Sequence, residues 1–473
     1  MSEKLSLPAY TKGMVREAAV DSPLSPPDSV ELSLNLHGDT IGALKLRKGM
    51  TLLGSAVSAG NPVLGIGNYR NNAGTAYRAL AKAGTKAFAY DGSNWSEIRD
   101  GLVSASKMRF TNFVDYTFMV NGSGSNGNAL RTYDGTTVAG VNVASLPQGE
   151  FVENYRSRIW VGDASTDKLY YSDVVSTSNT ITGGTSFLQI SPQDGEKMTG
   201  LKRTSRALLV FKQNHIYRVF NINSTDPDPS INVGTYSHES IIESKAGIHY
   251  HHSSGFYDFV FDGEQREISR PIVDIIQAIP RSYYDNVSGW SDDDHIFWSI
   301  GDITLGGITF SNVVCARTLS TENWTVYSTG SEIRSAGIYD DGTTLHRLVG
   351  DSSGNVLRWG VGNTDNGTPI YYDLQTHWIY LSQVRTETKS FTDLASLHEN
   401  ANGGNLSYQL DSDAPNKWRP IGGLEKDLTQ VDTINAKDFL RIRFRFSGNS
   451  SGSPFTFRGW ELLNLLIGSA VKK

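Results

Sequence analysis

His249 and His251 come closest, among the residues of this chain, to the types and spacing of a metal site. They lie two residues apart in the stretch HYHH, and residues two apart on a β-strand point to the same face of a sheet. Zinc bound by imidazoles needs at least three protein ligands in all. No third ligand is identifiable nearby in the sequence, so the pattern favours an exposed strand edge over a metal site.

Carboxylates gather in two short stretches, residues 291–295 (SDDDH) and 411–415 (DSDAP). A calcium loop needs ligands at fixed positions and a closing bidentate acid. Neither stretch supplies that ladder of ligands. Both stretches are therefore predicted to be solvated turns.

Two stretches match the Gly-x-Ser-x-Gly pattern of a nucleophile elbow, residues 350–354 (GDSSG) and 448–452 (GNSSG). An elbow needs a strand before it and a helix after it, whereas both matches lie between predicted strands. The glycine-rich stretch 65–74 lacks the Lys-Ser/Thr pair of a phosphate loop. The sequence thus predicts no catalytic, cofactor-binding or metal-binding residues, and a protein that is not an enzyme.

The single cysteine, Cys315, excludes a disulfide framework and a cysteine-based zinc site. It lies in the apolar stretch SNVVCARTL and is predicted to be a small core residue. The N-terminal stretch lacks an apolar signal-peptide core, and no run approaches the ~18 apolar residues of a membrane span. We therefore expect a chain with no membrane segment, made in a cytoplasm and not exported by the usual route.

Short strands separated by tight turns must position these residues. With 47 glycines and 10% aromatic residues, the composition favours many short strands. From Leu46 onward an apolar strand, an Asp-Gly or Asn-Gly turn and a second strand recur, as in KAFAYDGSNWSEI and HRLVGDSSGNVLRWG. Repeats of this size predict an all-β fold, a β-propeller of about seven blades over residues 46–370. The closing blade is expected to use strands from both ends of this region.

The two ends of the chain differ from the repeats. Residues 1–45 include the Pro- and Ser-rich run SPLSPPDS and are predicted to form an extended N-terminal arm, packed on the body or on a neighbouring subunit. Residues 371–473 contain longer strands and are predicted to form a separate C-terminal β-sandwich-like domain. In FLRIRFRF apolar residues alternate with arginine, as expected of a half-exposed strand.

One short helix is predicted within this β chain. Ser269 is placed to cap it, and Pro271 is tolerated in its first turn. Ile272, Ile275 and Ile276 would then share one face. The helix either covers an open apolar edge between blades or forms a subunit contact in a ring.

Arg441, Arg443 and Arg445 alternate along one predicted strand face. This pattern is typical of a solvated outer face. It is also consistent with a subunit interface, where arginine is enriched, or with contact to DNA or an acidic partner. The net charge of −6 gives no general case for wrapping nucleic acid.

The order of several motifs resembles one protein family. The motifs are FDGEQREISRPIVDII, VVCARTLSTENWTVY, LSYQLDSDAPNKWRPIG, FLRIRFRFSG and FTFRGWELL. Together they resemble the tail-hub proteins of short-tailed bacteriophages, also called nozzle or packaged-DNA stabilisation proteins. The resemblance covers about the last half of the chain, is looser over residues 62–98 and is absent before residue 46.

The resemblance implies a structural protein of the virion, assembled in the bacterial cytoplasm. Such proteins form a homo-oligomeric ring, expected to be a hexamer, below the portal and the tail adaptor protein. Tail fibre, spike or needle proteins would lie below the ring. Packaged DNA would pass through the lumen without sequence-specific binding and be retained there until release.

A second class of function is a carbohydrate-binding or carbohydrate-cleaving β-propeller that acts on host surface polysaccharide. It would explain the aromatic residues and the acidic stretches. It predicts a pair of acids or a tryptophan platform at the mouth of the propeller, and usually an export signal. The tryptophans are spread over the repeats, which favours blade packing over a sugar platform.

Overall fold

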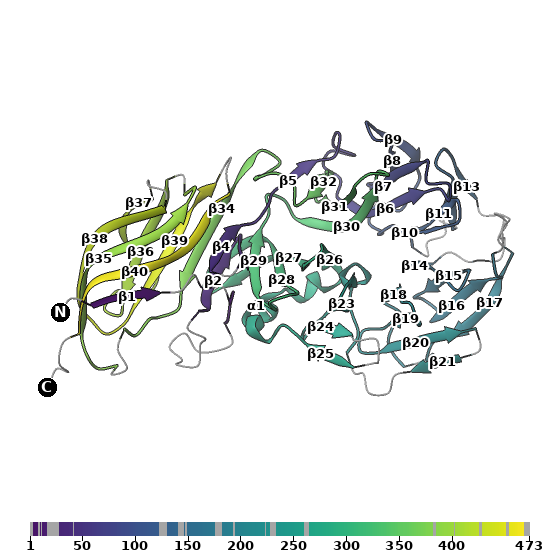
Figure 1. Ribbon diagram of the computed structural model, residues 1–473. Helices are drawn as coiled ribbons and strands as arrows, with labels where there is room; N and C mark the ends of the chain where they lie inside the picture. Colours follow the sequence, from purple (N-terminus) through teal and green to yellow (C-terminus); the bar gives the residue numbers. More distant parts are fainter. Residues whose placement is uncertain are drawn as a thin grey trace.

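The protein consists of a ring of small β-sheets and a second β domain beside it (Figure 1). The computed structural model describes residues 3–7, 10, 12–16, 28–40, 42–122, 130–140, 146, 149–175, 182–192, 194–222, 224–227, 233–259, 264–381, 385–401, 403–424, 428–450 and 454–467. No helix in these ranges is long and apolar enough to cross a membrane.

The first five blades are separate four-stranded antiparallel sheets. Each blade runs through its strands in sequence order, so consecutive strands pair. Blade one contains β6 (Val63–Arg70), β7 (Tyr77–Ala83), β8 (Lys86–Tyr90) and β9 (Trp95–Arg99), and blade two contains β10 (Arg109–Phe113), β11 (Tyr116–Val120), β12 (Arg131–Tyr133) and β13 (Val138–Gly140). Blade three contains β14 (Phe151–Tyr155), β15 (Arg158–Asp163), β16 (Lys168–Ser172) and β17 (Gly183–Gln189), and blade four contains β18 (Gly200–Arg203), β19 (Leu208–Phe211), β20 (Ile216–Asn221) and β21 (Ser224–Pro227). Blade five contains β22 (Ile242–Ser244), β23 (Gly247–His252), β24 (Gly255–Phe259) and β25 (Gln265–Glu267).

Blades six and seven complete the ring and confirm the predicted propeller. Blade six contains β26 (Ser288–Ser291), β27 (His295–Leu305), β28 (Ile308–Thr318) and β29 (Trp324–Ser328). Blade seven contains β30 (Ile333–Asp340), β31 (Leu345–Asp351), β32 (Val356–Trp359) and, from the N-terminal side of blade one, β5 (Met50–Leu52). Leu52 pairs with Leu357 and Met50 with Trp359. The closing blade therefore draws on both ends of the repeat region, as expected.

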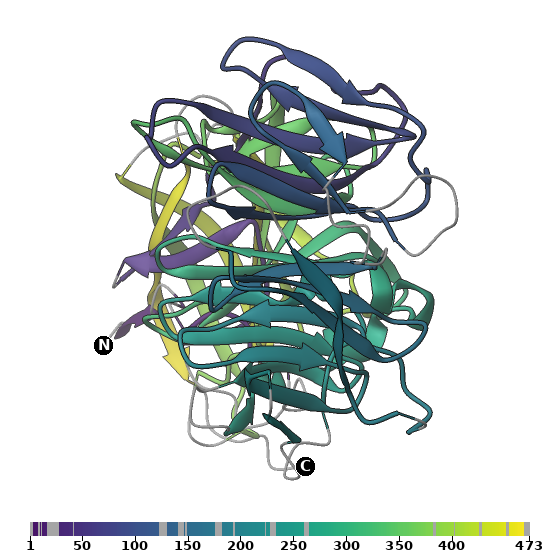
Figure 2. The ribbon, with the colours of Figure 1, turned by 90° about the vertical axis from the view of Figure 1, so that its right-hand side faces the viewer.

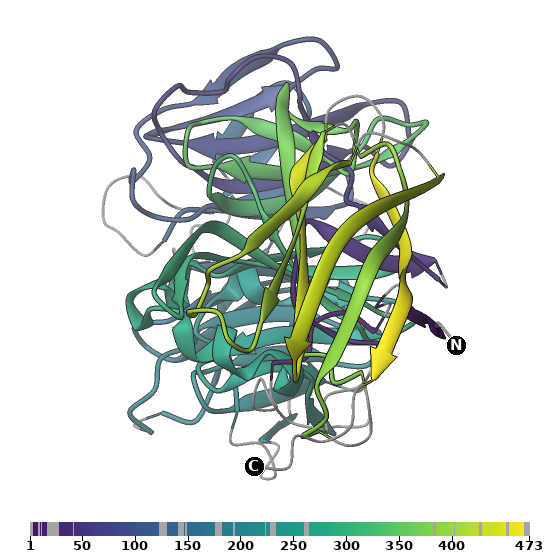
Figure 3. The same cartoon turned by 90° about the vertical axis from the view of Figure 1, so that its left-hand side faces the viewer.

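The second domain is built from two sheets that face each other, as Figure 3 shows from its side. A continuous stack of rings joins them, in which Tyr372 and Phe455 lie 4.4 Å apart. One sheet contains β1 (Glu3–Leu7), β3 (Leu36–Thr40), β4 (Ala43–Leu46), β35 (Lys389–Glu399), β38 (Leu428–Phe439) and β40 (Thr456–Ile467). The other contains β2 (Val30–Leu34), β34 (Thr368–Thr376), β36 (Gly404–Leu410), β37 (Arg419–Leu424) and β39 (Ile442–Ser450), with the short β33 (Thr364–Asp365) leading into β34.

The N-terminal segment differs from the extended arm that the sequence predicted for residues 1–45. The strands β1 to β4 belong to the two sheets of the second domain, where β1 and β4 pair with β40. The alternating stretch VELSL, which forms β2, buries Val30, Leu32 and Leu34, and this burial outweighs the tendency of the preceding Pro-rich run to stay extended. Residues 22–27 of that run lie outside the described residues.

A shared core joins the propeller to the second domain. One cluster of buried side chains includes Phe256, Trp298 and Trp324 of blades five and six together with Phe444 and Trp460 of the second domain. Strand β2 also pairs in parallel with β29 of blade six through Leu34 and Val326. Figure 2, viewed from the propeller side, shows the blades stacked in front of the second domain. Burial of this common apolar surface is expected to make the two parts unfold together.

The predicted helix is present as a 3-10 turn, η2 (Arg270–Ile272), followed by α1 (Val273–Ala278). Ile272, Ile275 and Ile276 are buried in the shared core. The helix therefore covers the apolar edge of its own chain, and these three side chains are not available to a neighbouring subunit.

The predicted cap by Ser269 is wrong. The backbone conformation there is not that of an N-cap, and no side-chain cap bond forms. Instead the Ser269 hydroxyl accepts a hydrogen bond from the backbone N–H of Phe256, at 3.0 Å. The cap is lost because the hydroxyl satisfies a buried strand N–H, whose desolvation costs more than that of an exposed helix end. The Asp-Gly pair of the stretch FDGEQREIS, Asp262 and Gly263, which the repeat pattern predicts to be a turn, lies outside the described residues.

Candidate functional site at the centre of the ring

The first strand of each blade lies at the centre of the ring. Neighbouring first strands contact each other around the ring. One run of contacts joins β6, β10, β14 and β18, and a second run joins β22, β26 and β30 and returns to β6. Because each blade repeats the same up-and-down order, these strands begin at the same end of the ring. Residues just before or at their first positions therefore meet at one mouth of the propeller.

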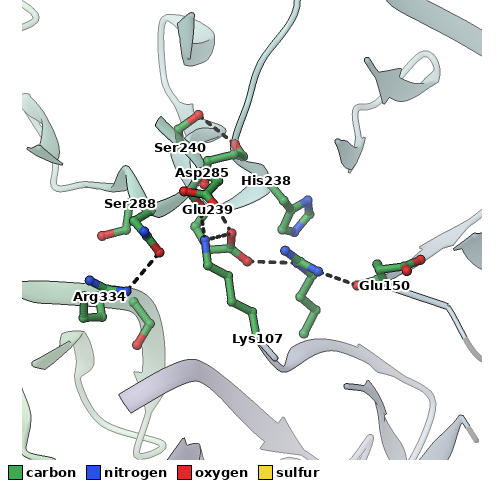
Figure 4. Close-up of polar contacts among 12 residues, drawn as sticks. Lys107, Glu150, His238, Glu239, Ser240, Asp285, Ser288 and Arg334 are labelled. Carbon is green, nitrogen blue, oxygen red and sulfur yellow. Dashed lines mark hydrogen bonds and ion pairs between the residues drawn. The ribbon is translucent and has the colours of Figure 1, made fainter. Parts of the chain in front are cut away.

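Three charged side chains meet at this mouth, Lys107, Arg109 and Glu239, and we call them the central clamp. Figure 4 labels Lys107 and Glu239 among the polar contacts there. Lys107 precedes β10 and Arg109 begins it, in blade two. Glu239 lies on η1 (His238–Ser240), which leads into blade five. The Nζ of Lys107 lies 2.8 Å from one carboxylate oxygen of Glu239, and the Nε of Arg109 lies 2.9 Å from the other.

Backbone carbonyls of two further blades complete the contacts of the central clamp. Lys107 also donates to the carbonyl of Asp285, on η3 (Arg281–Asn286) before blade six. Arg109 donates to the carbonyl of Glu150 before blade three, at 2.7 Å, and its guanidinium lies over the ring of Phe151. The clamp thus connects blade two to blades three, five and six.

Burial and charge fix the protonation states at the mouth. Each of the three clamp side chains is only 14–15% exposed. Burial by itself would raise the pKa of Glu239, but Arg109 and Lys107 hold that pKa well below its usual range. Burial, together with the charge of Arg109, lowers the pKa of His238 to about 3. At neutral pH Glu239 is ionised and His238 is neutral.

These states suit a structural tie better than acid–base catalysis. A general acid must hold a proton near the working pH, and Glu239 does not. A nearby pair repeats the pattern between blades seven and six, where Arg334 donates to the side chain of Asn286 at 2.9 Å.

The histidine pair of the sequence lies inside blade five. His249 and His251 are both completely buried in β23, between β22 and β24, so the expected exposed strand edge is wrong. His249 contacts the carboxylate of Asp258 at 2.5 Å and the hydroxyl of Ser244 at 2.6 Å. Among the described residues no group of three or more His, Cys, Asp or Glu side chains is placed to hold a metal ion.

The prediction of a solvated arginine face on β39 is wrong for Arg443. It is 7% exposed, and it donates to Gln409 at 2.8 Å and to Glu31 at 2.9 Å. Its guanidinium lies 4.9 Å from the ring centres of both Trp378 and Trp418. A buried guanidinium needs such partners, so Arg443 ties β39 to β2 and to β36 within the chain.

Arg441 and Arg445 flank this contact and remain partly exposed. Arg445 makes a two-point contact with the buried carboxylate of Asp373, at 3.0 and 2.8 Å. Arg441 lies 4.5 Å over the ring of Trp378. The three arginines thus act first within their own chain, and only the partly exposed two retain surface for a neighbour.

The acidic and serine-containing stretches behave as turns. Asp292 accepts hydrogen bonds from the backbone N–H and the ring of His295, at 2.7 and 3.0 Å. Asp351, in the stretch GDSSG, accepts from the backbone N–H groups of Ser353 and Asn355, so this match is a turn between β31 and β32. Residues 451 and 452 of the second match lie outside the described residues. Cys315 is buried, as predicted.

The central clamp was not predicted from the sequence. Lys107 and Arg109 lie in SKMRF and Glu239 in SHES, and neither stretch carries a known motif. Their meeting depends on ring closure, which brings together residues about 130 positions apart.

No protein-family model and no curated protein matches the chain. Solved structures that align with it include the Neurospora crassa Pan2 WD40 domain, at 11% identity and a TM-score of 0.41, covering 68% of this chain and 97% of that one. An extracellular domain from B. thetaiotaomicron aligns at 10% identity and a TM-score of 0.43, covering 88% and 61%. The AfRom2 CNH domain aligns at 9% identity and a TM-score of 0.39, covering 65% and 96%. At these identities the likenesses concern the fold alone.

Proposed function

We propose that this chain is a structural tail protein of a short-tailed bacteriophage, a tail hub or nozzle. It forms a ring, taken to be a hexamer, below the portal–adaptor complex. The ring builds the exit channel for DNA, helps retain packaged DNA, and carries fibre, spike or needle proteins below. The proposal rests on the motif resemblance in the sequence and on the mechanical character of the central clamp.

The central clamp is the observation that carries the mechanical part of this proposal. The charged groups at the propeller mouth pair with one another and tie opposite blades together. A subunit that bears the pressure of packaged DNA needs rigid blades and no reactive centre. Ion pairs with low exposure are costly to break one partner at a time, so they resist opening of the ring.

The clamp also bears on the path that DNA would take through the proposed assembly, because it closes the centre of the propeller. The major groove of duplex DNA alone is about 12 Å wide, whereas contacts of 2.8–2.9 Å join blade two to blade five across the propeller centre. The proposal therefore puts the exit channel in the space enclosed by the ring of subunits, with the centre of each propeller in its wall.

Exposed apolar side chains at one end of the second domain provide a surface for a neighbour. Leu440, Leu466 and Ile467 are 37%, 60% and 43% exposed. The strand register places them at the same end of the sheet, because Lys389 pairs with both Phe439 and Ile467. Apolar side chains that gather in this way are typical of contact surfaces between proteins.

Binding to a purified portal–adaptor complex from a short-tailed phage tests the proposal. We expect the full chain to co-sediment with the complex in a fixed ratio. The variant Leu466→Lys should weaken this binding at least tenfold, because it puts a charge into an apolar contact. Val174→Lys, at an equally exposed apolar residue of blade three, is the matched control and should bind normally. Absence of binding to every adaptor tried would contradict the proposal.

A further inference from the structure

A cavity of about 560 Å³ lies where the propeller meets the second domain. Its walls come from the β3–β4 hairpin of the second domain, the crossing segment 46–48, the β26–β27 turn of blade six and strands β31 and β32 of blade seven. This volume falls in the range of small-molecule sites, which form preferentially at domain junctions. Cavities of this size hold a ligand such as a single sugar with its substituents.

Packed aromatic rings form the floor of this junction cavity. Trp359 lies 5.2 Å from Phe297 and 6.3 Å from Tyr327, ring centre to ring centre. Stacked above them, His37 of the second domain and His295 of blade six lie 5.8 Å apart and nearly parallel. Both parts of the protein therefore contribute to one rigid, pre-formed wall.

The acidic side chains of the cavity already have ion-pair or hydrogen-bond partners. Asp293 accepts from Arg347 at 2.6 Å. Asp294 lies 3.0 Å from the Nζ of Lys245, and Asp292 binds His295. Two of the three acids, Asp293 and Asp294, are thus paired with cations, and the exposed carboxylate of Asp293 retains oxygen lone pairs that can accept hydroxyl hydrogens.

Two lysines of the cavity carry the remaining charge. Lys45 and Lys48 line it from the second domain and the crossing segment, and both are exposed. Neither has a carboxylate partner among the described residues. Arg47 between them is instead buried and bound in two-point fashion to Asp365. Two ammonium groups without partners at the edge of a pocket attract an anion.

We propose that the junction cavity binds a small sugar that carries one anionic group, a carboxylate or a phosphate. The anionic group binds Lys45 and Lys48. The sugar hydroxyls donate to the carboxylate of Asp293 and lie against the imidazole pair. This inference does not rest on the tail-hub proposal, since a monomer and a ring subunit would both contain the cavity. It gives the carbohydrate-binding alternative a location away from the propeller mouth.

Titration calorimetry of the full chain with four probes tests this proposal. The probes are glucuronate, glucose 6-phosphate, glucose and inorganic phosphate. We expect glucuronate or glucose 6-phosphate to bind at least tenfold more tightly than glucose and than inorganic phosphate. Binding of glucuronate alone would identify a carboxylate as the anionic group, and binding of glucose 6-phosphate alone a phosphate.

Variants at the cavity rim locate the binding. The double variant Lys45→Gln/Lys48→Gln should lose at least tenfold in affinity, because two charge-assisted hydrogen bonds are removed. Asp293→Asn should weaken the sugar acid and leave inorganic phosphate unchanged. The control Lys417→Gln/Lys437→Gln, at two exposed lysines of the second domain, should bind normally. Three outcomes would each overturn the proposal. Neither anionic sugar binds at about 10 mM, inorganic phosphate binds as tightly as the anionic sugars, or the rim variants leave the affinity for the sugars unchanged.

Discussion

At the scale of single residues, the carboxylate of Glu239 pairs with the positive charges of both Lys107 and Arg109 at the propeller mouth. Replacing it with glutamine leaves Lys107 and Arg109 with little exposure and no carboxylate. We expect Glu239→Gln to lower the free energy of unfolding by roughly 3 kcal/mol, since breaking a buried ion pair on one side strands a charge. Urea denaturation measures this loss.

The matched control and the pH dependence sharpen this prediction. Glu97→Gln breaks a pair with Lys86 in which both side chains are 41% exposed, and it should change stability little.

Because the pKa of Glu239 is depressed, the stability that its ionised carboxylate contributes is complete above the ordinary pKa of glutamate. This stability is lost only as the pH falls through the lower pKa of the folded state. The loss in Glu239→Gln should therefore be the same at pH 6 and pH 8; a loss confined to the higher pH would contradict the clamp.

His251 makes a second prediction at this scale. It packs against Phe256 and Tyr284, and burial lowers its pKa to about 3. Between the ordinary histidine pKa and this value the unfolded chain binds the extra proton, so stability falls as pH falls. We expect His251→Phe to gain about 2 kcal/mol relative to wild type on going from pH 8 to pH 5. Denaturant titrations at the two pH values measure it, and an equal difference at both would refute it.

Residues whose role depends on local sequence were predicted, and those whose role depends on distant partners were not. Cys315 was placed in the core by its apolar neighbours, and the GDSSG turn by its spacing. The burial of Arg443 depends on Glu31, more than 400 positions away, so alternation along one strand indicated a solvated face. The central clamp depends in the same way on closure of the ring.

At the scale of elements, the segment that leads from β4 to β5 holds β5, the strand that completes blade seven, in place. Arg47, 2% exposed, binds Asp365 at two points and donates to Asn35 at 2.8 Å. We expect Arg47→Met to lower the free energy of unfolding by about 3–5 kcal/mol, because Asp365 is left buried and unpaired. Adding Asp365→Asn should restore part of that loss.

A surface pair is the control for Arg47. Arg70 contacts Asp340 at 3.3 Å with a side chain that is 53% exposed, and Arg70→Met should cost less than about 1 kcal/mol. If the two arginine variants were equally stable, the closing strand would not depend on the Arg47 contact.

Strand-and-turn units were the elements best predicted from the sequence. Turns of the Asp-Gly type need left-handed backbone, and Gly92 and Gly135 adopt it, with φ of 103° and 95°. The arm was predicted only in part: its packing on the body is confirmed, but its Pro-rich run was taken to represent the whole segment, which forms strands. The strands β1 to β4 acquire their place only from β40 and β34, which lie at the other end of the chain.

At the scale of the whole molecule, the second domain depends on both ends of the chain. A fragment of residues 366–473 lacks β1 to β4, whose Leu36 and Leu44 are fully buried. We expect this fragment to be unfolded on its own and to fold when residues 1–48 are fused to it through a flexible linker. Circular dichroism of the two fragments distinguishes these outcomes, and a folded fragment 366–473 would show that the N-terminal strands are dispensable.

The proposed function is a property of an assembly, so its mass is the most direct test. Native mass spectrometry of the purified full chain, alone and mixed with a tail adaptor, reports the number of copies that associate. The tail-hub proposal predicts a closed ring of six copies, formed by the chain alone or on the adaptor. A chain that stays monomeric under both conditions, and binds no tail component, would contradict it.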